Sequence, residues 1–433
     1  MNIGKLQIII IGTGLLAALV AVLIFSGVLP GFSTFNSGAE KKITMWGTLD
    51  ADLLADTLSD LNRPPNAINV TYQKKNPLSF ESELIDALAR QAGPDLVIFP
   101  SELILKYSDK LLAIPDVFMT ERVFRDTFAD GTDNLIMPSG QIIGVPFLID
   151  PLVLFYNRDL FRNESIPAAP KTWNEFLSYS QKLTKINSTG AILQSGSALG
   201  VDTNIKSWKE IFSMMVLQTG APIVDRSTLS VRFSPPGSDI NTVENALGFY
   251  TDFVNPRKSS YSWSRSLAPS DEAFGRELLA MYFGLASENP QLKARNPHLN
   301  FDIAGVPQIS GGKLNLTYGR FFSLGITRQS KNSAIGLEAI SLLISPVEMS
   351  PASKKFFMAP SRRDLLGQAP GNPEFETIYK ESVKSKNWLD IDYTKTSRIL
   401  SQMIQFVYTG VKTKNEASSD AKLQLESLYD PIR

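Results

Sequence analysis

The chain has 433 residues, with 43 lysines and arginines against 43 aspartates and glutamates, so its formal net charge is zero. It contains no cysteine and a single histidine, His298. These counts exclude disulfides, thiolate metal sites and cysteine nucleophiles, and they leave only His298 for a Ser-His-Asp triad. The balanced charge gives no reason to expect a nucleic-acid partner. We find no P-loop or dinucleotide-binding fingerprint and expect no cofactor and no metal.

The amino-terminal segment Ile8–Leu29 is almost entirely apolar. As one helix with a rise of about 1.5 Å per residue it would reach about 33 Å, enough to cross a hydrocarbon core of roughly 30 Å. A cleaved signal usually has a shorter apolar core of about 7–15 residues. We therefore predict an uncleaved membrane anchor at residues 8–29, preceded by a cytoplasmic segment at 1–7 that carries Lys5. A small, polar tether at 30–41 then leads to an extracytoplasmic part.

The early part of that region alternates strand and helix patterns. The apolar run Ile43–Trp46 predicts a strand, and a helical pattern follows from Asp50 to Leu61. Alternation over Ile68–Tyr72 predicts a second strand, and the spacing over Phe80–Leu88 predicts a second helix. A short apolar run at Pro94–Phe99 predicts a third strand. Strands and helices in this order imply a parallel sheet flanked by helices.

Two further apolar runs, Gln141–Phe147 and Leu152–Tyr156, are separated by Asp150 and a proline. Thr172 and Glu175 form a predicted capping box at the start of a helix. The class is α/β with a helix-rich second half. The remaining predicted elements are helices at Trp208–Leu217, Val243–Val254, Arg398–Tyr408 and Ala417–Leu428, and strands at Ala280–Gly284 and Phe301–Val306.

Several phrases in order resemble a known family. The strongest are Gly144–Phe147, Leu154–Phe161 and Pro170–Phe176, which read G-V-P-F, L-F-Y-N-R-D-L-F and P-K-T-W-N-E-F. Together they resemble the signature of the extracellular solute-binding proteins of ABC importers, in the family that contains the maltodextrin-binding proteins. Supporting phrases extend the resemblance from about Ile43 to Leu428.

The resemblance implies a type II periplasmic-binding-protein fold, in which two α/β lobes are joined by hinge strands and close on a ligand between them. We expect three crossings between the lobes, near Phe147–Pro151, Ala280–Gly284 and Ala334–Leu342. The expected domains are residues 42–147 plus 285–333 for the first lobe and residues 148–284 plus 334–433 for the second.

The resemblance also suggests residues that contact ligand. Trp46, at the end of the first strand, is one of them. Asp50, in the loop after Trp46, matches an aspartate that binds ligand hydroxyls, although it also suits a helix N-cap. Phe99 stands where family members carry a stacking tryptophan, although a phenylalanine at the end of a strand is often buried. Glu102 matches a ligand-binding acid, and Asp150 matches an acidic hinge residue, although an aspartate before proline is also common in turns.

Two aromatic residues complete the predicted site. Trp263 lies between serines, so we expect it to be exposed and to offer a stacking platform. Tyr282 lies at the second crossing, where a position in the cleft and a position in the core are equally compatible with the sequence. Family members usually carry a tryptophan shortly after this strand, but Gly284–Ser287 contains none. This departure argues against maltodextrin itself as the ligand.

These observations predict a membrane-tethered protein that captures a small polar solute, a saccharide by the resemblance, and delivers it to an ABC permease. It would be a single-pass protein of the cell membrane with its amino terminus inside, and it would not be an enzyme. Two alternatives remain open: an exported glycosidase that uses two carboxylates, and a surface sensor or adhesion protein with a degenerate cleft.

Overall fold

The computed structural model describes residues 41–432. The predicted anchor at residues 8–29 lies outside the described residues. Within residues 41–432, no single helix is long and apolar enough to cross a membrane. Helices α12 (Ser333–Leu343) and α13 (Pro346–Lys355) meet that criterion only together, as a pair bent by 69°.

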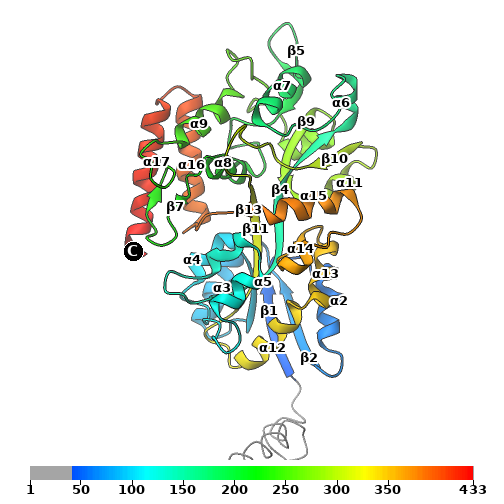
Figure 1. Ribbon diagram of the computed structural model, residues 1–433, viewed down its shortest axis with the longest axis vertical. Coiled ribbons are helices and arrows are strands. Elements are labelled where there is room, and N and C mark those ends of the chain that lie inside the picture. Colours follow the sequence, from blue (N-terminus) through cyan, green and yellow to red (C-terminus); the bar gives the residue numbers. More distant parts are fainter. Residues whose placement is uncertain (1–40, 433) are drawn as a thin grey trace, which may run out of the picture.

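Two groups of elements are stacked along the long axis of the molecule (Figure 1). We call the lower group, around β1 (Lys41–Gly47), the N-lobe, and the upper group, around β9 (Leu279–Leu285), the C-lobe. Strands β4 (Val145–Asn157) and β11 (Thr317–Ile326) run between the two groups. They belong to a single sheet whose main path has the order β2-β1-β3-β11-β4-β9-β6-β5.

The N-lobe is built on the predicted parallel sheet. Strand β1 pairs in parallel with β2 (Ile68–Lys74) on one side and with β3 (Leu96–Pro100) on the other. Helix α2 (Ala51–Leu61) follows β1, and α3 (Phe80–Ala89) follows β2. The alternation of strand and helix expected from the sequence is therefore confirmed in this region, because each connection is short and each helix buries an apolar face.

Strand β11 pairs antiparallel with β3 on one side and with β4 on the other. Strand β4 is continuous, whereas the sequence predicted two apolar runs separated at Asp150 and Pro151. The proline is tolerated because the neighbouring strand changes here on one edge of β4: β12 (Ala359–Pro360) pairs with residues 148–149, and β9 pairs from Leu152, while β11 pairs with the other edge. The missing N–H of Pro151 thus falls between two ladders.

The C-lobe extends the same sheet from β9. Strand β6 (Ile192–Ser197) pairs in parallel with β9, and β10 (Phe301–Ala304) pairs antiparallel with the far end of β4. Helix α7 (Trp173–Leu183) begins with the predicted capping box, in which the Thr172 side chain accepts from the Glu175 amide at 3.2 Å. The capping-box prediction is therefore confirmed.

The remaining elements are short strands and the helices that cover both lobes. The other strands are β5 (Lys185–Ile186), β7 (Ile223–Val224), β8 (Val231–Arg232) and β13 (Ser385–Lys386). The other α-helices are α4 (Ile104–Tyr107), α5 (Glu121–Thr127), α6 (Arg158–Asn163), α8 (Trp208–Gln218), α9 (Val243–Asp252), α10 (Ser270–Gly275), α11 (Asn289–Arg295), α14 (Arg363–Leu366), α15 (Pro373–Val383), α16 (Tyr393–Tyr408) and α17 (Lys414–Tyr429). The 3₁₀ helices are η1 (Ser101–Leu103), η2 (Asp130–Leu135), η3 (Ala286–Glu288) and η4 (Asp430–Ile432).

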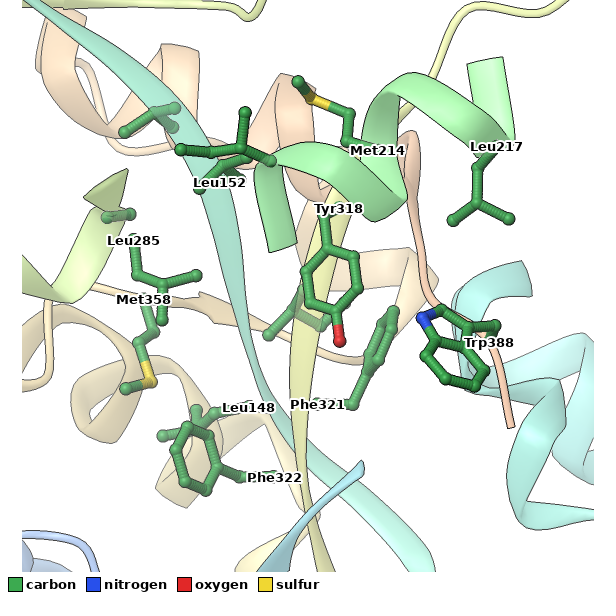
Figure 2. Close-up of a cluster of buried hydrophobic side chains, with 14 of the residues drawn as sticks. Leu148, Leu152, Met214, Leu217, Leu285, Tyr318, Phe321, Phe322, Met358 and Trp388 are labelled. Carbon is green, nitrogen blue, oxygen red and sulfur yellow. The ribbon is translucent and has the colours of Figure 1, made fainter. Parts of the chain in front are cut away.

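One continuous cluster of buried apolar side chains surrounds β4 and β11 where these strands pass from one lobe to the other. Figure 2 shows Leu148 beside Phe322 and Met358 on the N-lobe side of this crossing, and Leu152 beside Met214 on the C-lobe side. All five are at most 7% exposed. This packing fixes the two strands that pass between the lobes and thereby positions the polar residues they carry.

The structure differs from the expected second and third crossings. The expected second crossing, Ala280–Gly284, lies in β9, which pairs with β6 and with the C-lobe part of β4 and so stays in the C-lobe. Residues Ala334–Leu342 lie inside helix α12, which packs against α2 and β1 in the N-lobe, and strand β11 runs between the lobes instead. Strand β10, which falls in the part expected to belong to the first lobe, pairs with the C-lobe end of β4. The crossings were placed on the basis of the resemblance, and no local pattern distinguishes a strand that passes between lobes from an element that stays within one lobe. The predicted lobe boundaries remain a prediction.

Candidate ligand-binding site

A cavity of about 820 Å³ lies where the two lobes meet. The ends of β1, β2 and β3 contribute residues from the N-lobe, β4 and β11 contribute residues from the crossing, and α16 contributes residues from the C-lobe. This volume falls in the range of small-molecule sites, about 300–1,000 Å³. Its polar and charged lining residues are Thr48, Asp50, Lys74, Glu81, Glu102, Asp150, Ser287, Gln291, Arg320, Lys355, Tyr393 and Thr394.

Arg320 on β11 connects the two lobes at this cavity. Its Nε donates to Glu102 Oε1 at 2.7 Å, and its Nη2 donates to Glu210 Oε1 at 3.0 Å. Glu102 follows β3 in the N-lobe, and Glu210 lies on α8 in the C-lobe. Burial alone would lower the pKa of Arg320, but the two carboxylates hold it well above its usual value. One guanidinium therefore pairs with a buried acid from each lobe, and the trio keeps one excess negative charge.

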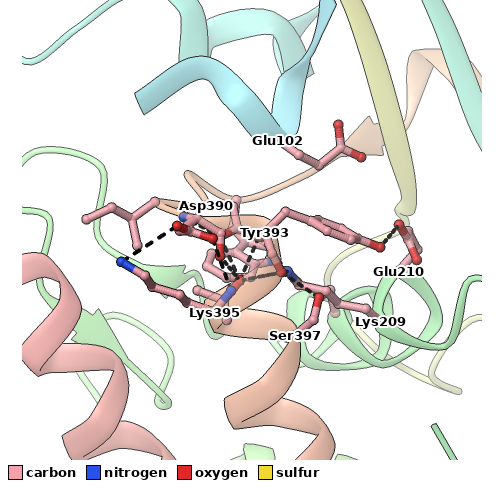
Figure 3. Close-up of polar contacts among 12 residues, drawn as sticks. Glu102, Lys209, Glu210, Asp390, Tyr393, Lys395 and Ser397 are labelled. Carbon is pink, nitrogen blue, oxygen red and sulfur yellow. Dashed lines mark hydrogen bonds and ion pairs between the residues drawn. The ribbon is translucent and has the colours of Figure 1, made fainter. Parts of the chain in front are cut away.

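Tyr393 extends this network into the C-lobe. Its hydroxyl donates to Glu210 Oε1 at 3.0 Å, as Figure 3 shows. Lys209 Nζ lies 3.8 Å from the centroid of the Tyr393 ring and donates to Asp390 Oδ2 at 2.6 Å. Because Lys209 and Asp390 are each about 4% exposed or less, their charges compensate each other inside the lobe. The network holds the Tyr393 ring at the cavity wall.

Asp150 lies on β4 directly opposite Arg320 on β11, so the two side chains lie on the same face of the sheet. Asp150 is 1% exposed and accepts hydrogen bonds from the Ser287 amide at 3.0 Å and from the Ser287 hydroxyl at 2.6 Å. Burial raises the pKa of Asp150 to about 7, although the Ser287 hydrogen bonds and the charge of Arg320 act in the opposite direction.

Lys106 on α4 forms a second link between the lobes at the cavity. Its Nζ donates to Asp392 Oδ2, at the start of α16, at 2.9 Å and also forms an ion pair with Glu81 on α3. Burial alone would lower the pKa of Lys106, and the two carboxylates raise it above its usual value. Thus Glu81, which lines the cavity, is already paired with a cation.

The other charged residues at the cavity are also paired. Lys74 Nζ lies 2.6 Å from Asp50 Oδ2, and its hydrogen bond lowers the pKa of Asp50. Lys355 forms an ion pair with Asp56 on α2. Among the described residues, no group of three or more histidines, aspartates or glutamates is arranged to hold a metal ion. The arrangement therefore favours a ligand that hydrogen-bonds to paired charges.

Comparison with known families agrees with this architecture. Residues 66–349, more than half of the chain, match the family described as bacterial extracellular solute-binding protein. The chain belongs to this family. The family resemblance found in the sequence is thereby confirmed, and the family is one of binding proteins.

Solved structures of other solute-binding proteins share the fold of this one. A binding protein for cyclic α-maltosyl-1,6-maltose from Arthrobacter globiformis has a TM-score of 0.76 and 17% identity, over 90% of this chain and 99% of that one. A cyclo/maltodextrin-binding protein complexed with maltotetraose has a TM-score of 0.72 and 16% identity, over 91% of this chain and 98% of that one. A Thermotoga lettingae solute-binding protein bound to α-D-tagatose has a TM-score of 0.70 and 18% identity, over 90% and 99%. At these identities the likeness shows a two-lobed α/β periplasmic-binding-protein-like fold.

A curated relative from Deinococcus radiodurans, described as a probable ABC transporter-binding protein, is 24% identical over 249 residues. The alignment covers 56% of this chain and 53% of the relative, so this solute-binding protein spans about half the length of the relative it matches.

Three of the seven predicted site residues, Asp50, Glu102 and Asp150, lie together at the cavity of this solute-binding protein. Trp46 is half-buried on β1, where Lys75 Nζ lies 3.6 Å from its ring centroid, and it does not line the cavity. Phe99 is fully buried and packs against the Tyr107 ring.

The two aromatic residues expected from the C-lobe are both buried. Trp263 is 0% exposed, and its Nε1 donates to Asn204 Oδ1 at 3.0 Å, so it is a core residue and not the exposed platform that the sequence analysis expected. Its serine neighbour Ser262 is also buried, because its hydroxyl donates to the Ser197 carbonyl at 2.8 Å. Tyr282 is 1% exposed and donates to Glu288 Oε2 at 2.5 Å, which assigns it to the core as well.

The sequence analysis missed Arg320, Glu210, Tyr393 and Lys106. A charged residue within the apolar strand around Arg320 was an available signal, because an unpaired charge is rarely buried. The same is true of Glu210 in the apolar run Trp208–Leu217. Tyr393 and Lys106 carry no comparable signal, since only the three-dimensional fold brings them to the cavity.

We expect the Arg320→Met variant to lose about 3–5 kcal/mol of unfolding free energy, because it leaves Glu102 and Glu210 buried without a cation. The matched control is Arg276→Met, which removes an exposed ion pair to Glu272 and should cost less than about 1 kcal/mol. Urea unfolding of both variants measures the difference. Equal losses in the two variants would contradict the bridging role of Arg320.

We expect the stability of the Asp150→Asn variant, relative to the parent, to increase with pH. Because folding raises the pKa of Asp150, the folded protein favours the neutral carboxyl. The stabilisation that results is at its full value below the usual pKa of 3.8 and is lost as the pH rises to about 7. Asparagine stays neutral and avoids this loss. Melting temperatures between about pH 5 and about pH 8 test the trend. Asp126→Asn, at an exposed position, is the control. If the stability of Asp150→Asn relative to the parent does not change with pH, the raised pKa of Asp150 is refuted.

Proposed function

We propose that this solute-binding protein captures a small uncharged solute, a saccharide, between its lobes and delivers it to an ABC importer. In this proposal the segment at residues 8–29 anchors the chain in the cell membrane with the amino terminus inside. The observation that carries the proposal is the pairing of the charged groups at the interlobe cavity, with Arg320 held between Glu102 and Glu210.

Charge pairing favours a neutral ligand for a physical reason. An anionic solute would have to separate Arg320 from Glu102 and Glu210 or be buried without a partner, and either change is costly. Sugar hydroxyls can donate to carboxylates such as Asp50 and Glu102 and accept from Arg320 while these pairs remain intact. The ring of Tyr393 adds an aromatic surface against which the C–H face of a sugar can pack.

The comparisons support this proposal without testing it. Two of the proteins with the same fold are described with maltotetraose and α-D-tagatose, which are neutral saccharides. The curated relative described as a probable ABC transporter-binding protein supports an importer as the partner. We infer that lobe closure around the solute is the signal that the permease recognises.

For the ligand contacts we retain Asp50, Glu102 and Asp150 and add Arg320 and Tyr393. A glycosidase, the first alternative, needs one protonated and one free carboxylate beside the scissile bond. The raised pKa of Asp150 would suit the acid, but Arg320 already neutralises Glu102. A surface sensor would share the same cavity, and a permease that copurifies with the chain would argue against that alternative.

We expect neutral mono- or oligosaccharides to raise the unfolding free energy in a thermal-shift screen. At a free ligand concentration of 100 times Kd the gain should be about 2.7 kcal/mol. The Tyr393→Ala variant should reduce the gain, because it removes a ring at the cavity wall, whereas Tyr261→Ala, outside the cavity lining, should not. If an amino acid or a phosphate ester stabilises the protein while every sugar fails, the saccharide assignment is wrong. Hydrolysis of a glycoside by the purified chain would contradict the proposal of pure capture.

A further inference from the structure

The interlobe cavity has two ends of different chemistry. One end carries the charge pairs Glu81–Lys106 and Glu102–Arg320, with Tyr393 beside them. Lys106 also reaches Asp392 at the start of α16, so this end is the polar junction between α3, α4 and α16. Hydroxyl groups placed here find both donors and acceptors.

The other end is apolar. Leu53 on α2 lines it together with Phe356 and Met358, which follow α13. The ion pair between Lys355 and Asp56 holds α13 beside α2, an arrangement that Figure 1 also shows.

The strand register places a further aromatic side chain at this end. Phe322 on β11 lies opposite Leu148 on β4, and Met358 immediately precedes β12, which pairs with the same part of β4. Figure 2 accordingly shows Phe322 and Met358 close to Leu148. The ionic groups that the described lining contributes near these side chains are Lys355, whose charge Asp56 compensates, and the Asp50–Lys74 pair at the start of α2.

Two leucines of the cavity lining remain open to solvent. Leu53 is 37% exposed, and Leu78, at the rim of the cavity, is 96% exposed. When an apolar group of a ligand covers such exposed apolar surface, the removal of both from water stabilises the complex. Sugar hydroxyls facing these side chains would lose hydrogen bonds to water without replacement. None of the five tryptophans of the chain, all of which lie within the described residues, lines the cavity.

We propose that the solute carries an apolar substituent, as an alkyl or aryl glycoside does. Its sugar part lies at the end formed by Glu81, Glu102 and Arg320, and its apolar group lies against Leu53, Phe356 and Met358. This inference rests on the proposed function, because it takes the solute to be a saccharide and narrows its class.

The test compares matched pairs of probes by isothermal titration calorimetry on the full-length chain. The pairs are glucose, maltose and mannobiose, each against its p-nitrophenyl glycoside. We expect the aryl glycoside of at least one pair to bind about tenfold or more tightly than the plain sugar, which corresponds to about 1.4 kcal/mol.

The Leu53→Asn variant should reduce this advantage to less than about threefold while leaving the affinity for the plain sugar unchanged. Leu423→Asn, at a 65% exposed position of α17 outside the cavity lining, is the matched control and should leave both affinities unchanged. Because Leu53 is partly exposed on a helix, melting temperatures near that of the parent should confirm that both variants fold.

The outcomes separate this inference from the proposed function. If plain sugars bind and the aryl group gives no gain, the inference is overturned and the saccharide assignment stands. An aryl gain that Leu53→Asn does not reduce also overturns it, because the apolar group then lies elsewhere. If no saccharide binds with or without the aryl group, both the inference and the saccharide assignment are overturned.

Discussion

The ion pairs of Arg320 with Glu102 and Glu210 are the interaction on which the site depends. Arg320 lies on β11, which pairs with β3 and with β4, and its two partners come from different lobes. A buried arginine between two buried carboxylates is stable only while all three keep their geometry. The network therefore ties the position of the lobes to the strand that crosses between them, and it places at the cavity charged groups that are already paired with one another.

Much of the fold could be predicted from the sequence where local patterns decide it. The strand and helix order of the N-lobe, with Asp50 as the N-cap of α2, and the capping box at Thr172 depend on residues close together in the chain. The continuity of β4 through Pro151 could not be predicted, because it depends on which strands pair on either side. The third crossing, which was expected at Ala334–Leu342 from the resemblance, was wrong because these residues form α12 within the N-lobe.

The candidate site was predictable only in part. Asp50 and Glu102 were found because the family resemblance matches them to ligand-binding acids, and the structure places both just after the carboxyl ends of parallel strands. Trp263 was misjudged because its serine neighbours suggested exposure, whereas Ser262 satisfies its hydroxyl inside the core. Arg320 was missed because its two partners are distant in the sequence, at separations of 218 and 110 residues. Such pairs follow from tertiary structure and leave no periodic pattern.

We propose that the interlobe cavity accepts an uncharged solute because its charged groups already pair with one another. The most direct measurement is the Kd of a neutral saccharide found to bind, and of the corresponding uronic acid, at low ionic strength and at about 0.5 M salt. We expect the neutral sugar to bind more tightly than the uronic acid, and we expect its Kd to change by less than about twofold with salt. Tighter binding of the uronic acid, with an affinity that falls steeply as salt is added, would contradict it.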